Sequence, residues 1–96
     1  MKEEQLKRMM RDIYGREDIT PEAVEEFEEM LSELSEREEA VLSLRYGLKD
    51  GKEMSEQEVA DYYEVSLETI QKTMKQARLR LRHPLRTRRL FLQNMA

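Results

Sequence analysis

The sequence predicts a small all-α domain, and three observations favour this fold: the length, the composition and the spacing of the apolar residues. The 96 residues can form one modest hydrophobic core but not a deep cleft between two lobes. Charged residues make up 40% of the chain, and with only 3 glycines and 2 prolines the composition favours helix over sheet. Apolar residues recur every three or four positions, the period of an amphipathic helix. We therefore expect about five to six helices.

Two helices are predicted before residue 35. The first ends before Gly15, and its apolar face consists of Leu6, Met9, Met10 and Ile13. The second lies in DITPEAVEEFEEMLSEL, residues 18–34, where Thr20 can serve as the N-cap and Pro21 takes the first helical position. Its apolar stripe consists of Val24, Phe27, Leu31 and Leu34. Glutamate fills most of the remaining face, so we expect that face to be solvated or to meet a basic partner.

Two capping boxes mark the starts of the next two helices. In SERE, residues 35–38, and in SEQE, residues 55–58, the serine hydroxyl can accept from the third following amide while the glutamate reaches back to the serine amide. The first of these helices runs to about Tyr46, where Gly47 supplies a turn residue. The second is short and runs to Tyr63.

A longer helix follows from Ser66 to about residue 82, and with the short helix 55–63 it has the spacing of a helix-turn-helix. Its apolar face consists of Leu67, Ile70, Met74, Ala77 and Leu81. The small Ala60 would let the two helices approach closely. A generic helical hairpin would show the same periodicity, so the spacing leaves both interpretations open. Pro84 ends this helix or begins a last basic helix with Leu85, Leu90, Phe91 and Leu92.

The charge of the chain is strongly polarised. Residues 1–64 hold 20 acids and 9 Lys or Arg, a net charge of −11, whereas residues 65–96 hold 1 acid and 8 Lys or Arg, a net charge of +7. The arginines of the basic half lie close together, at Arg78, Arg80, Arg82, Arg86, Arg88 and Arg89. The two halves can neutralise each other, or the basic segment can face a polyanion, and both can hold together.

The residues that most enzymes and metal sites need are scarce. The chain has no cysteine, 1 histidine and only isolated glycines, so it offers no metal cluster, no nucleophile–base pair and no phosphate-cradling loop. We therefore expect no cofactor and no catalytic activity. No apolar run is long enough for a membrane span or the core of a signal peptide, and we place the protein in the cytoplasm.

The segment LSELSEREEAVLSLRYGLKDGKEMSEQEVADYYEVSLETIQKTMKQARLRLRHP, residues 31–84, resembles the fourth conserved region of bacterial primary-type sigma factors. The pieces that carry the resemblance are LSEREEAVLSLRYGL before a glycine turn, SEQEVADYYEVS, and KQARLRLRHP. In that family this region binds the promoter −35 element through a helix-turn-helix. The resemblance divides the chain into an acidic N-terminal helical arm, residues 1–30, and a region-four-like domain with a basic C-terminal tail, residues 31–96.

The resemblance also implies residues that hold the DNA backbone. Arg37 and Arg45 match family arginines that contact phosphates, and Ser55 matches a hydroxyl that caps the first helix of the motif. Arg78 and Arg82 lie beyond the first turns of the recognition helix, where they would hold backbone or an acidic protein surface without specifying sequence.

The first turns of the recognition helix depart from the family pattern. The family usually has arginine at the positions of Leu67, Thr69 and Gln71, so a family-like target sequence should not be assumed. Four exposed polar residues remain as candidates for base contacts, because carboxylates accept from cytosine, amides pair with adenine and lysines take guanine. They are Glu68, Gln71, Lys72 and Lys75.

Two functions stay open at this point. The first is a DNA-binding transcription regulator or sigma-like subunit that contacts double-stranded promoter DNA and the β-subunit flap of RNA polymerase, with a second sigma-type subunit where it directs initiation. The flap would dock near residues 31–46, where Leu42 or Leu44 would be exposed. The alternative is a sigma-fold interaction module that modulates polymerase or a sigma factor without sequence-specific DNA binding. The DNA sequence, the oligomeric state and the role of residues 1–30 are not determined by the sequence.

Overall fold

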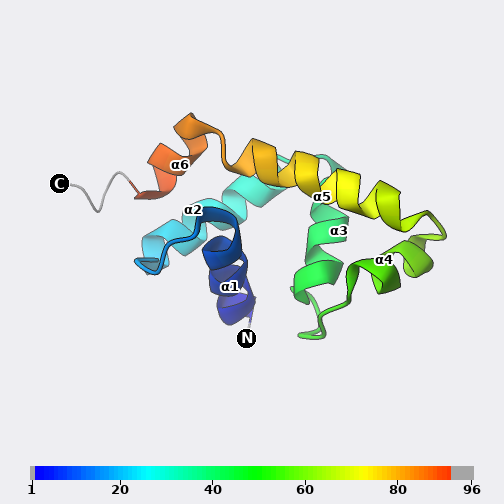
Figure 1. The fold of residues 1–96 in the computed structure, drawn as a ribbon. Helices are drawn as coiled ribbons and strands as arrows, with labels where there is room; N and C mark the ends of the chain where they lie inside the picture. The colour runs from blue at the N-terminus through cyan, green and yellow to red at the C-terminus, as the bar shows by residue number, and fades with distance from the viewer. Residues whose placement is uncertain (1, 92–96) are drawn as a thin grey trace.

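The computed structural model describes residues 2–91, and within this range it contains six helices and no strand (Figure 1). The helices are α1 (Lys2–Tyr14), α2 (Pro21–Ser32), α3 (Glu36–Tyr46), α4 (Glu56–Tyr63), α5 (Leu67–Leu81) and α6 (Pro84–Phe91). The all-α class and the helix-turn-helix pair are therefore confirmed. Leu92, which we expected in the last helix, lies outside the described residues.

Side-chain caps begin four of these helices at the predicted residues. Thr20, Ser35, Ser55 and Ser66 each accept a hydrogen bond from the backbone N–H three residues later. At α3 and α4 the capping box is complete, since Glu38 and Glu58 accept from the N-cap amides at 3.1 and 2.8 Å. These caps satisfy amides that have no partner within the helix, so the starts of the helices follow from local sequence.

Gly47 ends α3 in the left-handed conformation with a φ of 64°. A Cβ atom at this position would lie 2.8 Å from the backbone carbonyl carbon of Lys52, so a side chain would collide with backbone. The tight return that glycine permits brings Met54 back to α3, where its amide donates to the carbonyl of Leu44 at 3.1 Å. The start of the helix-turn-helix is thereby positioned next to the end of α3.

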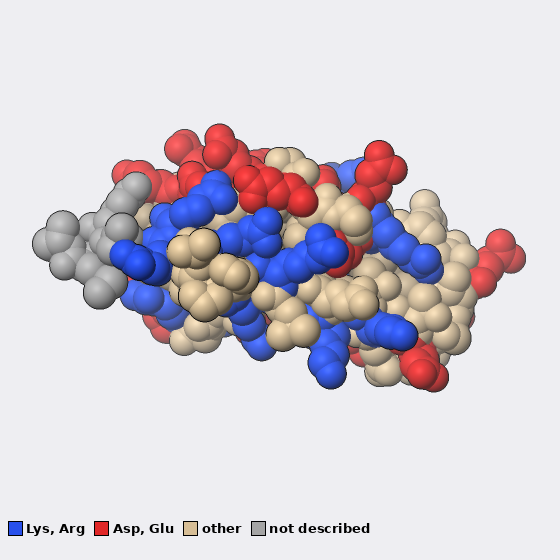
Figure 2. Space-filling model, turned by 90° about the horizontal axis from the view of Figure 1, so that it is seen from above, with Lys and Arg blue, Asp and Glu red and all other residues tan. Residues whose placement is uncertain are grey.

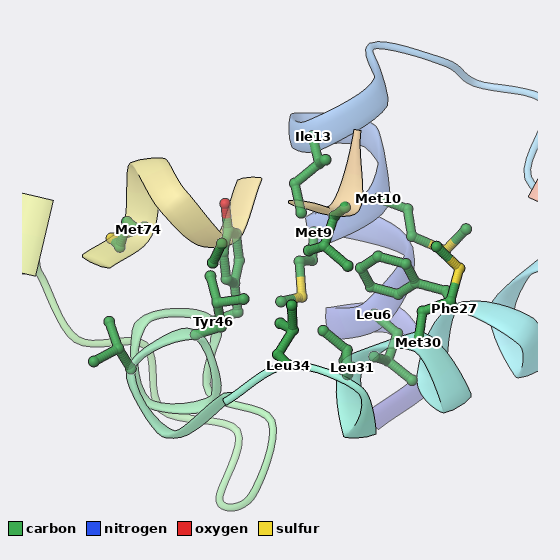
Figure 3. Close-up of a cluster of buried hydrophobic side chains, with 14 of the residues drawn as sticks. Leu6, Met9, Met10, Ile13, Phe27, Met30, Leu31, Leu34, Tyr46 and Met74 are labelled. Carbon is green, nitrogen blue, oxygen red and sulfur yellow. The ribbon is translucent and has the colours of Figure 1, made fainter. Parts of the chain in front are cut away.

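A hydrophobic core draws side chains from every described helix. The four predicted apolar residues of α1 are all buried. Figure 3 shows Leu6 and Met10 beside Phe27 and Met30 of α2, while Met9 extends toward Leu34. The core therefore crosses the boundary that we predicted between residues 30 and 31. The division into an arm and a domain stays a prediction.

The C-terminal end of α1 meets the C-terminal end of α6. Tyr14 at the end of α1 packs edge-on against Phe27 and Phe91, with ring centroids 6.0 and 5.5 Å apart. Leu90 is buried beside Phe91, whereas Leu85, which we assigned to the same apolar set, is exposed. The short helix α6 is thus attached to α2 through its C-terminal turn.

The helix-turn-helix is held by small and branched apolar residues. Val59, Ala60 and Ile70 are fully buried between α4 and α5. The turn passes through Glu64, which has a φ of 56°, and Val65, whose amide donates to the carbonyl of Ala60 at 3.0 Å. A left-handed conformation costs a non-glycine residue about 1–2 kcal/mol, so packing of the two helices must offset this local strain.

Candidate nucleic-acid interface

The four predicted base-contacting residues lie on the solvent face of α5. Ile70, Met74, Ala77 and Leu81 form the buried face of this helix, and Glu68, Gln71, Lys72 and Lys75 are all exposed. The Gln71 amide donates to the Glu56 carboxylate across the motif at 3.5 Å, a long contact that leaves most of its hydrogen-bonding capacity free. The quartet is available to a groove, and its role in base contact stays a prediction.

Two of the predicted backbone contacts are separate from the others. Arg37 is exposed in the first turn of α3. The Ser55 hydroxyl accepts from the amide of Glu58 at 3.1 Å, so its observed role is to cap α4. Contact of either residue with DNA stays a prediction.

The other predicted backbone contacts converge on one open hollow between α1, α3 and α5. Its volume is about 600 Å³, and we call it the basic hollow. Its lining consists of Asp12 from α1, Arg45 and Tyr46 from α3, and Lys75, Arg78, Leu79 and Arg82 around the end of α5. Four cations and one acid therefore surround it, and they include two predicted phosphate ligands from the tail of α5 and one from α3.

Neutral partners hold two of the guanidinium groups in the basic hollow. Arg45 donates to the carbonyl of Met54 at 3.3 Å, and its Nε–H is buried without a hydrogen-bond partner among the described residues. Arg82 donates through Nε to the carbonyl of Ile13 at 2.8 Å. Because carbonyl partners leave the positive charge uncompensated, both groups can still attract an anion.

Tyr46 is a buried residue in the lining of the basic hollow. Figure 3 shows it between Met74 of α5 and Met9 of α1. Burial raises the pKa of the Tyr46 hydroxyl, hydrogen bonding from Arg78 lowers it, and Asp12 raises it through charge and hydrogen bonding. Arg78 and Asp12 therefore both lie close to the Tyr46 hydroxyl.

A second group of arginines forms ion pairs with acids of the same chain. Arg80 pairs with the buried Glu38 at 3.5 Å, and Arg86 pairs with Glu33 at 3.5 Å. Arg89 donates through Nε to Glu26 at 2.8 Å and also pairs with Glu33. The acidic and basic halves of the chain thus neutralise each other in part, as the charge pattern allowed.

Lys and Arg nevertheless gather on one face. Figure 2 looks down on α5 and α6 and shows the basic side chains along the middle of this face, with Asp and Glu mainly toward its edges. A basic band with acidic edges is complementary to a linear polyanion. It is less complementary to a partner with a broad acidic surface.

Sequence reasoning missed Asp12, Tyr46 and Leu79 as neighbours of the cations. Asp12 and Tyr46 are 34 positions apart in the sequence, and nothing local signals their meeting. Leu79 is 59% exposed, which the apolar pattern of α5 does indicate, because this residue falls outside the buried stripe. The expected apolar docking residues also differ: Leu42 is fully buried and only Leu44 is partly accessible.

Leu44 borders a second, smaller hollow of about 230 Å³ between α3 and α4. Its other lining residues are Ala40, Ser43, Lys49, Asp50, Tyr62 and Tyr63. Tyr62 is 63% exposed and packs edge-on against Tyr63 with ring centroids 5.0 Å apart. Exposed aromatic rings of this kind are common where proteins bind each other.

No group of three or more acidic or histidine side chains within residues 2–91 could hold a metal ion. In the same range, none of the helices combines the length and the apolarity that crossing a membrane requires.

Comparison with known proteins places these features in a family. Residues 30–83 match the sequence profile of sigma-70, region 4. An RNA polymerase sigma factor SigA from a Bacillus species is 44% identical over 66 residues, which cover 69% of this chain and 18% of the relative. The chain therefore spans less than a fifth of that sigma factor. No solved structure matches the chain.

Proposed function

The chain belongs to the sigma-70, region 4 family of transcription factors, and on that premise we propose that it binds duplex promoter DNA through its helix-turn-helix, with α5 in the major groove. The observation that carries this proposal is the continuity of exposed polar residues along α5. Glu68, Gln71, Lys72 and Lys75 lead directly into the basic hollow. Base contacts and backbone contacts would therefore follow one another along a single helix face.

Core RNA polymerase is the proposed protein partner. The hollow beside Leu44 and Tyr62 supports docking of an apolar segment, and the β-subunit flap is the segment that we propose. A second sigma-type subunit would join the assembly where the protein directs initiation. These contacts rest on the family and on the exposed rings of α4.

An interaction module without specific DNA binding is the second candidate. The ion pairs of Arg80, Arg86 and Arg89 favour it, because they remove cations that would otherwise attract DNA. Leu67, Thr69 and Gln71 also stand where the family usually has arginine. Such a module would still bind RNA polymerase, but it would bind DNA only weakly.

A binding selection on random duplex DNA tests both candidates. The purified protein is used alone and with core RNA polymerase, at two salt concentrations, since phosphate contacts weaken steeply with salt. A motif enriched by the protein alone supports an independent DNA-binding protein, and enrichment only with polymerase supports a sigma subunit. No enrichment in either case, together with retained polymerase binding, contradicts the DNA proposal and favours the interaction module.

The same selection identifies the base-contacting residues. Gln71→Ala and Lys72→Ala should change the enriched motif and weaken binding to the original motif by roughly 5- to 100-fold, because a good base contact contributes about 1–3 kcal/mol of discrimination. Lys52→Ala is the matched control, since it removes an exposed lysine from the loop between α3 and α4 that lies outside both hollows. If both α5 variants select the wild-type motif, α5 does not contact bases in the groove.

A further inference from the structure

The cations of the basic hollow are unpaired, unlike Arg80, Arg86 and Arg89 of the tail; Arg88 also forms no ion pair within residues 2–91, but it does not line the hollow. Within residues 2–91, none of Arg45, Lys75, Arg78 and Arg82 forms an ion pair, whereas Arg80, Arg86 and Arg89 all do. Four unpaired cations around one hollow create a concentrated positive potential. One of these cations, Arg45, also has a buried Nε–H without a hydrogen-bond partner among the described residues. Both observations indicate a site for an anion.

One wall of this hollow comes from outside the family domain. The family match begins at residue 30, and α1 ends at Tyr14. Two reciprocal hydrogen bonds tie the end of α1 to the end of α5: Arg82 donates to the carbonyl of Ile13, and the Tyr14 hydroxyl donates to the carbonyl of Leu81, each at 2.8 Å. The apolar face of α1 is buried in the core. Asp12 is therefore held at the hollow by the fold.

Asp12 is the one acid in the lining, and no ion pair joins it to a cation within the described chain. The Asp12 carboxylate and the Arg78 guanidinium both lie near the Tyr46 hydroxyl. A negative charge at this place lowers the attraction of the hollow for any anion. An asparagine would keep the size of the side chain and remove that charge.

We propose that the basic hollow binds a backbone phosphate of duplex DNA and that Asp12, supplied by α1, weakens this binding by repulsion. The inference rests on the proposed function, because it assigns the hollow to the same DNA. It gives α1 a role in setting DNA affinity without affecting sequence preference, since phosphate contacts carry no base information. A DNA phosphate fits because Lys75 belongs both to the exposed face of α5 and to the hollow.

The decisive experiment compares Asp12→Asn with Glu4→Gln. Glu4 is the matched control because it is an exposed acid on the same helix and forms no ion pair within residues 2–91. Affinity for a random-sequence duplex is measured at low salt. Asp12→Asn should bind roughly fivefold more tightly than wild type, because a repulsive charge close to the phosphate is removed. Glu4→Gln should change binding by less than about twofold, because greater distance and screening weaken its effect.

Arg78 tests whether the gain arises in the hollow. Adding Arg78→Gln to Asp12→Asn should abolish the gain, because the proposed phosphate ligand is then lost. Thermal unfolding of each variant checks that the fold is intact. Equal gains in Asp12→Asn and Glu4→Gln, or a gain that survives Arg78→Gln, would overturn the proposal.

Inorganic phosphate separates this inference from the proposed function. The side-chain Nε–Hε signals of Arg45 and Arg78 are followed by NMR during titration of wild type and Asp12→Asn with phosphate. A stronger response in Asp12→Asn supports the anion site, and it does so even where DNA binding is absent and the proposed function fails. No response in either protein contradicts a phosphate site, whatever the result with DNA.

Discussion

Five of the six arginines near the end of the chain fall into two groups that the sequence does not distinguish, and Arg88 belongs to neither. Arg78 and Arg82 are four positions apart, so they lie on one face of a helix that turns every 3.6 residues, and they border the basic hollow. Arg80 projects from another side of the same turn and pairs with Glu38, while Arg89 on α6 pairs with α2. A dense basic segment therefore divides its charge between holding the fold together and leaving cations free for an external anion.

The largest expected effect is the loss of a cation from the basic hollow. Arg45→Ala should weaken binding to all DNA sequences alike by about tenfold or more and reduce the salt dependence, because a charge-assisted phosphate contact is lost. Arg89→Ala is the control, because Glu26 already neutralises that arginine. The measurement is duplex affinity at several salt concentrations. Equal losses in the two variants would mean that the division into two groups has no bearing on DNA binding.

The paired group should instead matter for stability. Glu38→Ala removes both the capping box of α3 and the buried partner of Arg80, so we expect a loss of about 1–3 kcal/mol in the free energy of unfolding. Chemical denaturation measures it. Glu58→Ala, which removes a capping box without an ion pair, should have a smaller effect. A Glu38→Ala protein as stable as the Glu58→Ala variant would show that the contact with Arg80 contributes nothing.

Tyr14 connects the two groups, since it lies at the junction of α1, α5 and α6. Tyr14→Phe removes the hydrogen bond to Leu81 and should destabilise the protein by about 1 kcal/mol. Burial raises the pKa of the Tyr14 hydroxyl above its ordinary value, although Arg86 and Arg82 oppose the shift. Because the pKa of Tyr14 is higher in the folded state than in the unfolded state, its protonated hydroxyl stabilises the fold fully below about pH 10. This stabilisation is lost as the pH rises further.

Thermal unfolding between about pH 8 and pH 11 measures this effect. The melting temperature of the wild type should fall toward alkaline pH, and that of Tyr14→Phe should fall less steeply. Tyr46, whose pKa burial also raises, contributes to the decline that remains in the variant. Parallel curves for the two proteins would contradict a buried, protonated Tyr14.

The helix starts, the turn at Gly47 and the exposed face of α5 could all be predicted from the residues. Each depends on interactions within a few positions: Ser35 and Glu38 satisfy each other's amides, and glycine alone fits the left-handed end of α3. The solvent face of α5 likewise follows from the apolar period of one helix. These features could be predicted because none of them depends on a contact with a distant segment of the chain.

Packing settled the features that join distant segments. The partner of Arg89 is 63 positions away, and Asp12 reaches the cations only because the apolar face of α1 is buried in the core. Leu42 is buried and Leu85 exposed for the same reason, since burial depends on which neighbour covers a residue as well as on its hydrophobicity. The sequence by itself therefore determined the family domain and its helix-turn-helix. Which arginines stay unpaired was decided by the tertiary structure, because charges that are far apart in the sequence interact only at the distances that packing sets.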